Sequence, residues 1–225
     1  MGIIEASVIV PVWNRADLTH AFLFRNWQIF KAMEQIEFII VDNASTDNTL
    51  VILDRWQKTM GDRLTVVVNE KNLGFSGGNN EGAMHTNEIT KLLVFVSNDV
   101  IPFGDYITPL LKILKPRILY GAELLSHNTG WNTFQGIIIP YLTGWCVAAE
   151  HNTWFKYLEW DERYWPCDYE DIDLSCTATQ NGVQLQEVHL PLQHQSGQSA
   201  MGIAGGRLPV TQNSRELFIN KWGLE

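Results

Sequence analysis

Apolar residues gather in four short runs in the first hundred residues, at 7–12, 36–41, 64–68 and 92–96. The runs are rich in valine and isoleucine and show no polar alternation, which is typical of strands buried on both faces of a parallel sheet. Segments with helical spacing of apolar residues lie between them, at about 18–34, at 48–60 and in a third stretch that ends before residue 91. A Gly- and Asn-rich loop at 69–82 is expected to lead into that third helix. This alternation predicts an α/β fold with a doubly wound, mostly parallel central sheet flanked by helices.

The second half is less regular. Strands are expected at 118–125, 136–141 and 183–188, and helices at 106–114, from about 170 to 182, and at 213–222. A mixed and smaller set of strands therefore follows the parallel part. No Pro/Gly-rich linker separates the halves, so residues 1–225 are expected to form a single domain.

The formal net charge is −9. This acidic balance argues against nucleic acid as a partner, because nucleic-acid binding relies on basic surface. The three widely spaced cysteines fit neither a disulfide framework nor a zinc motif. No apolar run is long enough to span a membrane, and the first residues do not resemble a signal peptide. We therefore expect a cytoplasmic protein, with peripheral membrane association and oligomeric state left open.

Polar residues follow three of the four predicted strands, those at 7–12, 36–41 and 92–96. The strand at 92–96 is followed by Ser97, Asn98 and Asp99. Ligands in open α/β sheets bind beyond such strand ends. A carboxylate there would suit Mg²⁺ or Mn²⁺. Helix capping is the alternative, because Ser, Asn and Asp also serve in caps and turns.

Two further segments carry candidate nucleotide contacts. Asp42 follows the second strand, where it can accept hydrogen bonds from a base or ribose, or simply cap a turn. The loop at 72–80 is not a Walker A motif, because it lacks the Gly-Lys-Ser/Thr ending. Its glycines nonetheless permit close approach of a diphosphate to a helix N-terminus, although an ordinary glycine-rich loop is the alternative.

Acidic and aromatic residues concentrate at 160–174. Glu170, Asp171 and Asp173 fall at a predicted helix start, where the helix dipole favours acidic residues in any case. Three carboxylates flanked by Trp and Tyr also suit a general base beside a hydroxylated substrate. His194 is either structural or a neutral-imidazole metal ligand.

Five motifs, in order, resemble glycosyltransferase family 2, the inverting enzymes of the GT-A fold. The resemblance covers nearly the whole chain and is strongest to the rhamnosyltransferase-like branch. The motifs are the opening strand at 8–14, the base-binding turn at 39–47, the segment at 72–82, Ser97-Asn-Asp99 in place of DxD, and the acidic motif at 170–174. Residues 221–223 match the closing helix of that branch. Because Ser97 replaces the first acid of DxD, metal binding is expected to depend on Asp99.

The resemblance implies a metal-dependent transfer of one sugar from a UDP- or dTDP-linked donor to a hydroxyl of a glycan or other acceptor. Residues 1–100 would bind the nucleotide sugar, and residues 101–225 would hold the acceptor and the catalytic base. Asp99 and His194 would hold Mn²⁺ or Mg²⁺, and Asp171, with Glu170, would provide the base. Trp145 and Trp165 would stack on acceptor sugars, and Arg207 would close over the diphosphate or lie on a surface loop. The expected nucleotide-sugar contacts are Pro11, Asn14, Arg15, Asp42, Asn72, Gly74, Asn79 and Asn98.

Two other functions compete. A non-catalytic module that binds nucleotide sugars or carbohydrates could use the same scaffold. The presence of Asp99, Asp171 and His194 argues against this alternative. A nucleotidyltransferase normally has a glycine-rich loop after its first strand, and residues 12–15 contain no glycine.

Overall fold

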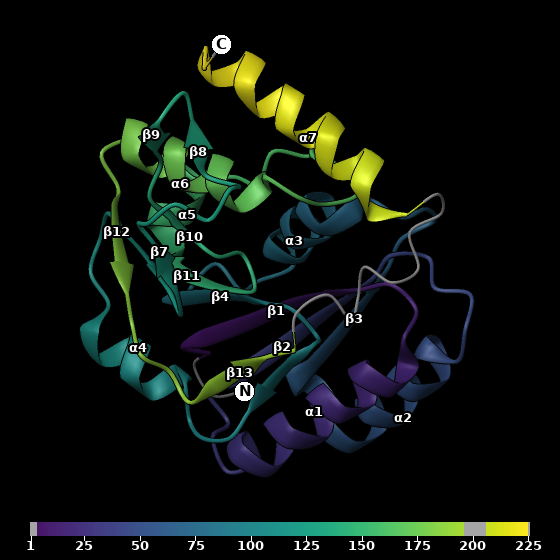
Figure 1. The fold of residues 1–225 in the computed structure, drawn as a ribbon. Coiled ribbons are helices and arrows are strands. Elements are labelled where there is room, and N and C mark those ends of the chain that lie inside the picture. Colours follow the sequence, from purple (N-terminus) through teal and green to yellow (C-terminus); the bar gives the residue numbers. More distant parts are fainter. Residues whose placement is uncertain (1–3, 196–205, 225) are drawn as a thin grey trace.

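The computed structural model describes residues 4–195 and 206–224 (Figure 1). Its centre is a seven-stranded sheet in the order β12-β6-β11-β4-β1-β2-β3. The strands are β1 (Ala6–Val12), β2 (Ile36–Asp42), β3 (Leu64–Val68), β4 (Leu92–Val96), β6 (Ile118–Gly121), β11 (Cys146–Glu150) and β12 (Gln184–Glu187). All neighbouring pairs are parallel except those of β11, which runs antiparallel to both β4 and β6. The predicted doubly wound, mostly parallel α/β sheet is confirmed, and strands from both halves of the chain form it.

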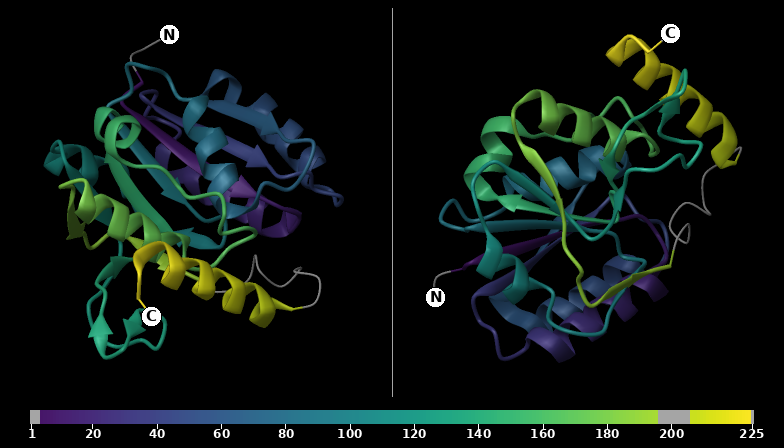
Figure 2. Two further views of the ribbon diagram at one scale, coloured as in Figure 1. Left: turned by 90° about the horizontal axis from the view of Figure 1, so that it is seen from above. Right: turned by 60° about the vertical axis from the view of Figure 1, so that its left-hand side comes forward.

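Helices cover both faces of this sheet (Figures 1 and 2). One face carries α1 (Ala16–Phe30), α2 (Thr49–Met60) and α4 (Ile107–Ile113); the other carries α3 (Gly74–Met84), α5 (His151–Tyr157) and α6 (Glu170–Gln180). Alternate residues of β1 divide between the two cores, with Val8 in one and Ile9 in the other. A third core joins α7 (Arg207–Trp222) to α6 through Phe218. No helix in the described part of the chain is long and apolar enough to cross a membrane.

Short strands complete the fold around the sheet. They form three antiparallel pairs: β5 (Val100–Pro102) with β13 (Leu192–His194), β7 (Leu124–Leu125) with β10 (Tyr141–Leu142), and β8 (Thr133–Phe134) with β9 (Ile137–Ile138). A 3₁₀ turn, η1, spans Gly61–Arg63. The two longer strands predicted at 118–125 and 136–141 are therefore wrong in extent. The first divides because β7 leaves the main sheet to pair with β10, and Pro140 separates β9 from β10.

The glycine-rich segment predicted as a loop is largely the helix α3. Its glycines allow the helix to lie directly against the sheet. A Cβ on Gly82 would lie 2.4 Å from Ile9 Cγ2, and one on Gly78 would lie 2.8 Å from both Pro11 Cβ and Asn43 Nδ2. The low helix propensity of glycine is thus overridden by close packing of helix and strand.

Two predicted helix ends also differ. The first helix ends at Phe30 rather than near residue 34, and Arg63 donates hydrogen bonds to the carbonyl oxygens of Phe30 and Lys31 there. These contacts satisfy acceptors that a longer helix would have used internally. The last helix begins at Arg207, six residues before the predicted start. Residues 196–205, which precede the predicted lid residue Arg207, lie outside the described residues.

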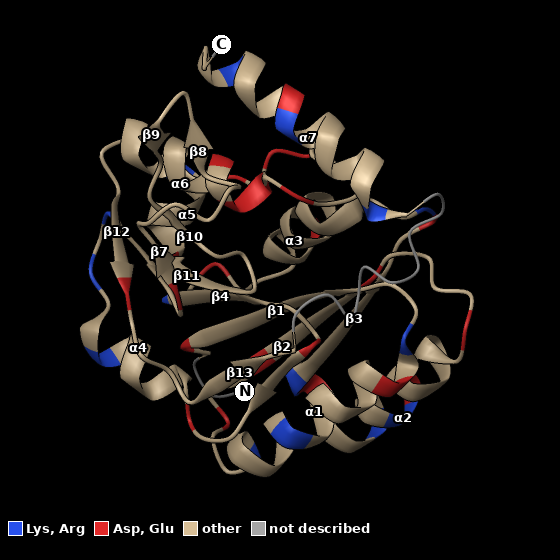
Figure 3. Cartoon of the chain, viewed as in Figure 1, with Lys and Arg blue, Asp and Glu red and all other residues tan. Residues whose placement is uncertain are grey.

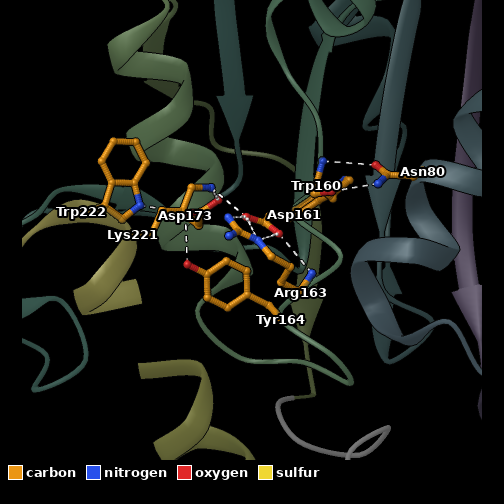
Figure 4. Close-up of polar contacts among 8 residues, drawn as sticks. All are labelled: Asn80, Trp160, Asp161, Arg163, Tyr164, Asp173, Lys221 and Trp222. Carbon is orange, nitrogen blue, oxygen red and sulfur yellow. Dashed lines mark hydrogen bonds and ion pairs between the residues drawn. The ribbon is translucent and has the colours of Figure 1, made fainter. Parts of the chain in front are cut away.

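A buried carboxylate fixes the C-terminal end of α7 to α6 (Figure 4). Asp173 is 1% exposed and accepts hydrogen bonds from Lys221 Nζ at 2.7 Å, Trp222 Nε1 at 2.8 Å and Tyr164 Oη at 3.1 Å. Lys221 also contacts Asp161 at 2.8 Å, and this lysine and the nearby Arg163 hold the pKa of Asp161 well below its ordinary value. Asp173, predicted as part of an acidic catalytic cluster, thus anchors a helix.

Candidate active site

Two adjoining cavities open at the carboxyl edge of the parallel strands. The smaller has a volume of about 120 Å³ and the larger of about 380 Å³. Both are lined by Phe75, Ser97 and Cys167, so they form one continuous depression. Its position at the carboxyl ends of β1 and β4 is the usual ligand position of open α/β sheets. The smaller cavity contains the predicted residues Pro11, Asn72, Gly74 and Asn98, and the larger contains Asp99, Trp145, Glu170, Asp171, His194 and Arg207.

Asp99 and His194 meet because two short strands pair. His194, on β13, lies opposite Val100 of β5, and this register places its Nε2 3.3 Å from Asp99 Oδ1. The backbone N–H of Gln195 also donates to the Asp99 carbonyl at 3.0 Å. Asp99 is only 3% exposed, yet it lines the larger cavity. The structure therefore brings together the two predicted metal ligands.

This donor set fits a hard divalent cation that is completed by a substrate. Within the described residues no group of three or more His, Cys, Asp or Glu side chains is arranged to hold a metal. Mg²⁺ and related ions are commonly bound by one or two protein side chains together with substrate phosphates and water. Asp99 supplies an oxygen ligand, and the imidazole of His194 is better suited to Mn²⁺ than to Mg²⁺.

The candidate base lies at the start of α6. Asp168 and Tyr169 both adopt left-handed backbone angles, with φ of 77° and 69°, and they turn the chain into the helix. Asp171 Oδ2 then accepts the Gly144 N–H at 3.0 Å, and Oδ1 accepts the Ile172 N–H at 2.9 Å. Figure 3 shows the start of α6 in red, and Glu170, Asp171 and Asp173 all lie in the first turn of this helix. Gly144 allows the close approach, because a Cβ there would lie 3.1 Å from Asp171 Cβ.

The neighbouring carboxyl groups differ in protonation. Burial raises the pKa of Asp171 to about 6, although the hydrogen bonds from Gly144 and Ile172 oppose the shift. Burial raises the pKa of Glu170 further, well above its ordinary value, and the charge of Asp171 adds to this effect. Glu170 Oε2 is buried with no hydrogen-bond partner among the described residues. Of these two neighbouring groups, Asp171 therefore favours its ionised form more, and Glu170 favours its protonated form more.

Arg207 is paired with the turn that precedes the base. Its Nε donates to both carboxylate oxygens of Asp168, at 3.0 and 3.1 Å, and its Nη2 contacts Oδ1 as well. Thr211 Oγ1 donates to the same carboxylate at 2.6 Å. Asp168 is 6% exposed, so its buried carboxylate is paired with Arg207 and hydrogen-bonded to Thr211. Arg207 lines the larger cavity, but a lid movement of its side chain would require this ion pair to break.

Four other predicted residues are not among those that line the two cavities. Asn14 and Arg15 adopt φ of 55° in the turn after β1; Asn14 Oδ1 accepts the Thr46 N–H at 2.8 Å, and Arg15 Nε donates to Asp17 at 3.0 Å. Asp42 is buried and accepts the Ser45 N–H at 3.1 Å, while its Oδ1 has no partner among the described residues. None of these three lines either cavity.

Asn79 is likewise buried away from the depression. It lies inside α3 and donates to the Phe75 carbonyl at 3.0 Å, with its own Oδ1 unpartnered among the described residues. Asn14, Arg15, Asp42 and Asn79 therefore shape the turns and the helix around the smaller cavity. Direct contact of these side chains with a nucleotide stays a prediction.

The two predicted acceptor tryptophans differ in position. Trp145 lines the larger cavity, but its ring is stacked on His194 with centroids 5.3 Å apart, and its Nε1 donates to Glu123 at 3.2 Å. Trp165 is 59% exposed, lines neither cavity, and donates to the Asn72 carbonyl at 3.0 Å. The structure thus brings Trp145, but not Trp165, beside the candidate base.

Several lining residues were not singled out from the sequence. Asn43 lines the smaller cavity and directly follows Asp42, so the strand-end argument could have identified it. Glu123, Trp131 and Tyr141 line the larger cavity from the irregular segment between β6 and β11. No periodicity marks that segment, and their positions follow only from the way it folds over α6.

Comparisons with known proteins identify the family and the fold of this chain. The family model described as glycosyl transferase family 2 matches residues 7–157, which is more than half of the chain. No curated protein sequence matches significantly. Among solved structures, the mannosyltransferase PcManGT from Pyrobaculum calidifontis, in complex with GDP-Man and Mn²⁺, has a TM-score of 0.69 at 16% identity, over 100% of this chain and 73% of that one.

Two further structures share the fold but are longer. Residues 1–349 of S. aureus TarS in complex with UDP give a TM-score of 0.63 at 16% identity, over 83% of this chain and 58% of that one. GalNAc-T7 with UDP, GalNAc and Mn²⁺ gives 0.66 at 14% identity, over 86% of this chain and 44% of that one. Such low identities show the common GT-A fold alone. The family match over residues 7–157 establishes that this chain belongs to glycosyl transferase family 2.

Proposed function

We propose that this chain transfers one sugar from a nucleotide-diphosphate sugar, UDP- or dTDP-linked, to a hydroxyl of a glycan or other acceptor, with inversion at the anomeric carbon. The observation that carries the proposal is the arrangement of the larger cavity. It places a carboxylate with a raised pKa, Asp171, in the same space as the Asp99–His194 pair. A base and a cation site in one cavity are what a single displacement on a diphosphate-linked sugar requires.

The nucleotide is proposed to occupy the smaller cavity. Pro11, Asn43 and Asn72 line it, and Gly74 lets the chain approach closely, because a Cβ there would lie 2.9 Å from Trp165 Cδ1 and from the Pro166 carbonyl oxygen. The sugar would then extend into the larger cavity past Ser97, which lines both. The base of the nucleotide would lie on the side of β2, near Asp42.

Asp171 is proposed to accept the proton from the attacking hydroxyl. Its two backbone hydrogen bonds fix the orientation of the carboxylate, and its raised pKa makes it a stronger base than an ordinary aspartate. Glu170, which burial shifts towards its protonated form, would instead donate a hydrogen bond to a substrate oxygen. Asp171 would act from the face opposite to the leaving diphosphate, which gives inversion.

Asp99 and His194 are the residues that would hold Mn²⁺ or Mg²⁺. When bound, such a cation stabilises the negative charge that develops on a departing diphosphate. The Mn²⁺ in the Pyrobaculum calidifontis mannosyltransferase and GalNAc-T7 complexes supports a role for a divalent cation. Ser97 also lines the larger cavity, but its hydroxyl is a weaker metal ligand than a carboxylate. Cation binding would therefore depend mainly on the carboxylate of Asp99.

Hydrolysis of a donor panel tests the function. UDP-, dTDP- and GDP-sugars would be incubated with Mn²⁺, and the released nucleotide measured; GDP-mannose is included because PcManGT was solved with GDP-Man. We expect turnover of at least one donor, and its loss with EDTA. Turnover unchanged by EDTA would remove the metal role, and nucleotide binding without turnover of any donor would favour the non-catalytic module.

A further inference from the structure

Trp131 occupies a distinctive position at the larger cavity. It lines this cavity together with Asp171, and its side chain remains 42% exposed. Its ring lies 6.0 Å from that of Tyr169, which precedes the base by two residues. A large aromatic surface is thus open to solvent on the side of the cavity where an acceptor hydroxyl would have to reach Asp171.

The loop that carries Trp131 is firmly held. The next residue, Asn132, is 0% exposed; its Nδ2 donates to the carbonyls of His127 at 3.1 Å and Ile139 at 3.0 Å. Its Oδ1 accepts the Thr129 N–H at 3.1 Å and the Thr129 hydroxyl at 2.8 Å. The buried amide therefore connects both sides of the loop. Exposure of Trp131 is not the result of a loosely attached segment.

The same loop is packed against the helix that bears the base. Phe134 of β8 is buried against Tyr169 and against Phe218 of α7, with ring centroids 6.5 and 5.1 Å away. Figure 1 shows β8 and β9 beside α6. Trp131 and Asp171 are therefore fixed relative to each other through one hydrophobic cluster. An aromatic side chain held in this way resembles a binding platform, which has little conformational entropy to lose on binding.

The polar groups around the platform define the chemistry of its ligand. Glu123 and Thr143 line the same cavity and can hydrogen-bond to hydroxyl groups. Arg207 is the cavity's one lysine or arginine among the described residues, and it is already paired with Asp168. The carboxylates of Glu123 and Asp171 would repel an acidic ligand. An apolar platform beside hydroxyl-binding groups suits an uncharged sugar ring, because the described lining has no unpaired lysine or arginine and the proposed Mn²⁺ is assigned to the donor diphosphate.

We infer that Trp131 is the stacking platform for the acceptor, and that the acceptor is a neutral pyranoside rather than an acidic glycan. This inference rests on the proposed function and names the acceptor class for the same site. The proposed role of Asp171 as the base is unchanged. Trp145 can still contact the acceptor, but His194 covers one face of its ring. The apolar face of a sugar ring would lie on Trp131, with one of its hydroxyls directed at Asp171.

Ligand-observed NMR tests the inference, because saturation transfer detects millimolar affinities. Protein loaded with UDP and Mn²⁺ would be mixed with neutral oligosaccharides and with their uronic-acid counterparts. We expect binding of neutral members, and a loss of about tenfold or more in affinity for Trp131→Ala. Trp131→Phe should restore most of it. Phe155→Ala is the matched control, because Phe155 is 46% exposed on α5 and lines neither cavity.

The outcomes distinguish a failure of this inference from a failure of the proposed function. UDP affinity of each variant would be measured on the same preparations, and we expect the fall in glycan affinity of Trp131→Ala to exceed any change in UDP affinity. Equal glycan affinity of Trp131→Ala and wild type, preference for acidic members, or no glycan binding by the nucleotide-loaded protein would each overturn the inference. Failure to bind or hydrolyse any donor would instead refute the proposed function.

Discussion

At the scale of single residues, the adjacent carboxyl groups Glu170 and Asp171 differ in pKa because their local surroundings differ. Asp171 accepts two backbone N–H groups, which stabilise its ionised form. Glu170 is buried, and its Oε2 has no partner among the described residues. The sequence could predict an acidic motif here, but not which member is ionised, because that depends on Gly144 from a distant loop.

Asp171→Asn should reduce glycosyl transfer at least about 100-fold, because the amide preserves the shape of the side chain but cannot accept the proton. Nucleotide binding, measured by calorimetry with UDP and Mn²⁺, should be nearly unchanged. Asp54→Asn is the control, since Asp54 forms an exposed ion pair with Lys58 on α2. Loss of nucleotide binding in Asp171→Asn would show that this residue has been given the wrong role.

The pH dependence of transfer should follow Asp171. Its pKa is raised to about 6 by burial, so the carboxylate becomes protonated, and inactive as a base, as the pH falls through about 6. Transfer at saturating Mn²⁺ should be constant above this pH and fall about tenfold for each unit below it. A pH–rate profile checks this, and an acid limb near pH 4, the ordinary range of an aspartate, would contradict the raised pKa.

At the scale of elements, α3 shows where local propensity misleads. Its sequence contains four glycines, at 74, 77, 78 and 82, and is typical of a loop. The helix forms because Gly78 and Gly82 let it pack against β1 and β2 at a distance that no larger residue permits, and Gly74 leaves room for Trp165 and Pro166. By contrast, the four strands of the first half were predictable from their apolar runs, because strands buried on both faces need no alternation.

Gly82→Ala should destabilise the protein, although alanine is the better helix former. The new Cβ would lie 2.4 Å from Ile9 Cγ2 and 3.0 Å from Val41 Cγ2, both in the core. Overpacking of this kind costs about 1–3 kcal/mol, and urea unfolding measures it. Met84→Ala, at a 72% exposed position of the same helix, should change little. Equal stability of Gly82→Ala and wild type would mean that α3 can move away from the sheet.

Asp173→Ala should weaken the attachment of α7. The substitution leaves three donors, from Lys221, Trp222 and Tyr164, without their acceptor. Removing one partner of such a buried polar group costs about 3 kcal/mol or more. Hydrogen exchange over residues 207–222 should increase more than elsewhere, whereas Asp54→Ala should have little effect. Unchanged protection of α7 would show that Phe218 and its neighbours hold the helix without Asp173.

At the scale of the whole molecule, strand ends are the part of the site that the sequence could locate. Asp99 and Asn98 follow β4 and line the depression, as predicted from their position. Asn14 and Arg15 follow β1 equally closely and adopt left-handed backbone angles, but neither lines a cavity, although the charge of Asp99 acts on Arg15. Trp131 was missed because its position depends on contacts between segments far apart in the chain, which periodicity does not record.

The fold joins the halves through an antiparallel strand that the sequence did not reveal. β11 lies between β4 and β6, and it continues the sheet from the nucleotide side to the acceptor side. Because of this connection, Asp99 after β4 and Asp171 on α6 face one cavity. The central claim is that this cavity and its smaller neighbour bind one nucleotide-diphosphate sugar and its cation.

A crystal structure with UDP or dTDP and Mn²⁺ tests that claim most directly. The anomalous signal of manganese should lie beside Asp99 and His194, with the diphosphate next to it and the nucleoside in the cavity lined by Pro11, Asn43 and Asn72. The same crystals of Asp99→Ala should lose the manganese peak. Manganese or nucleotide bound at any other place, with this depression empty, would contradict the account.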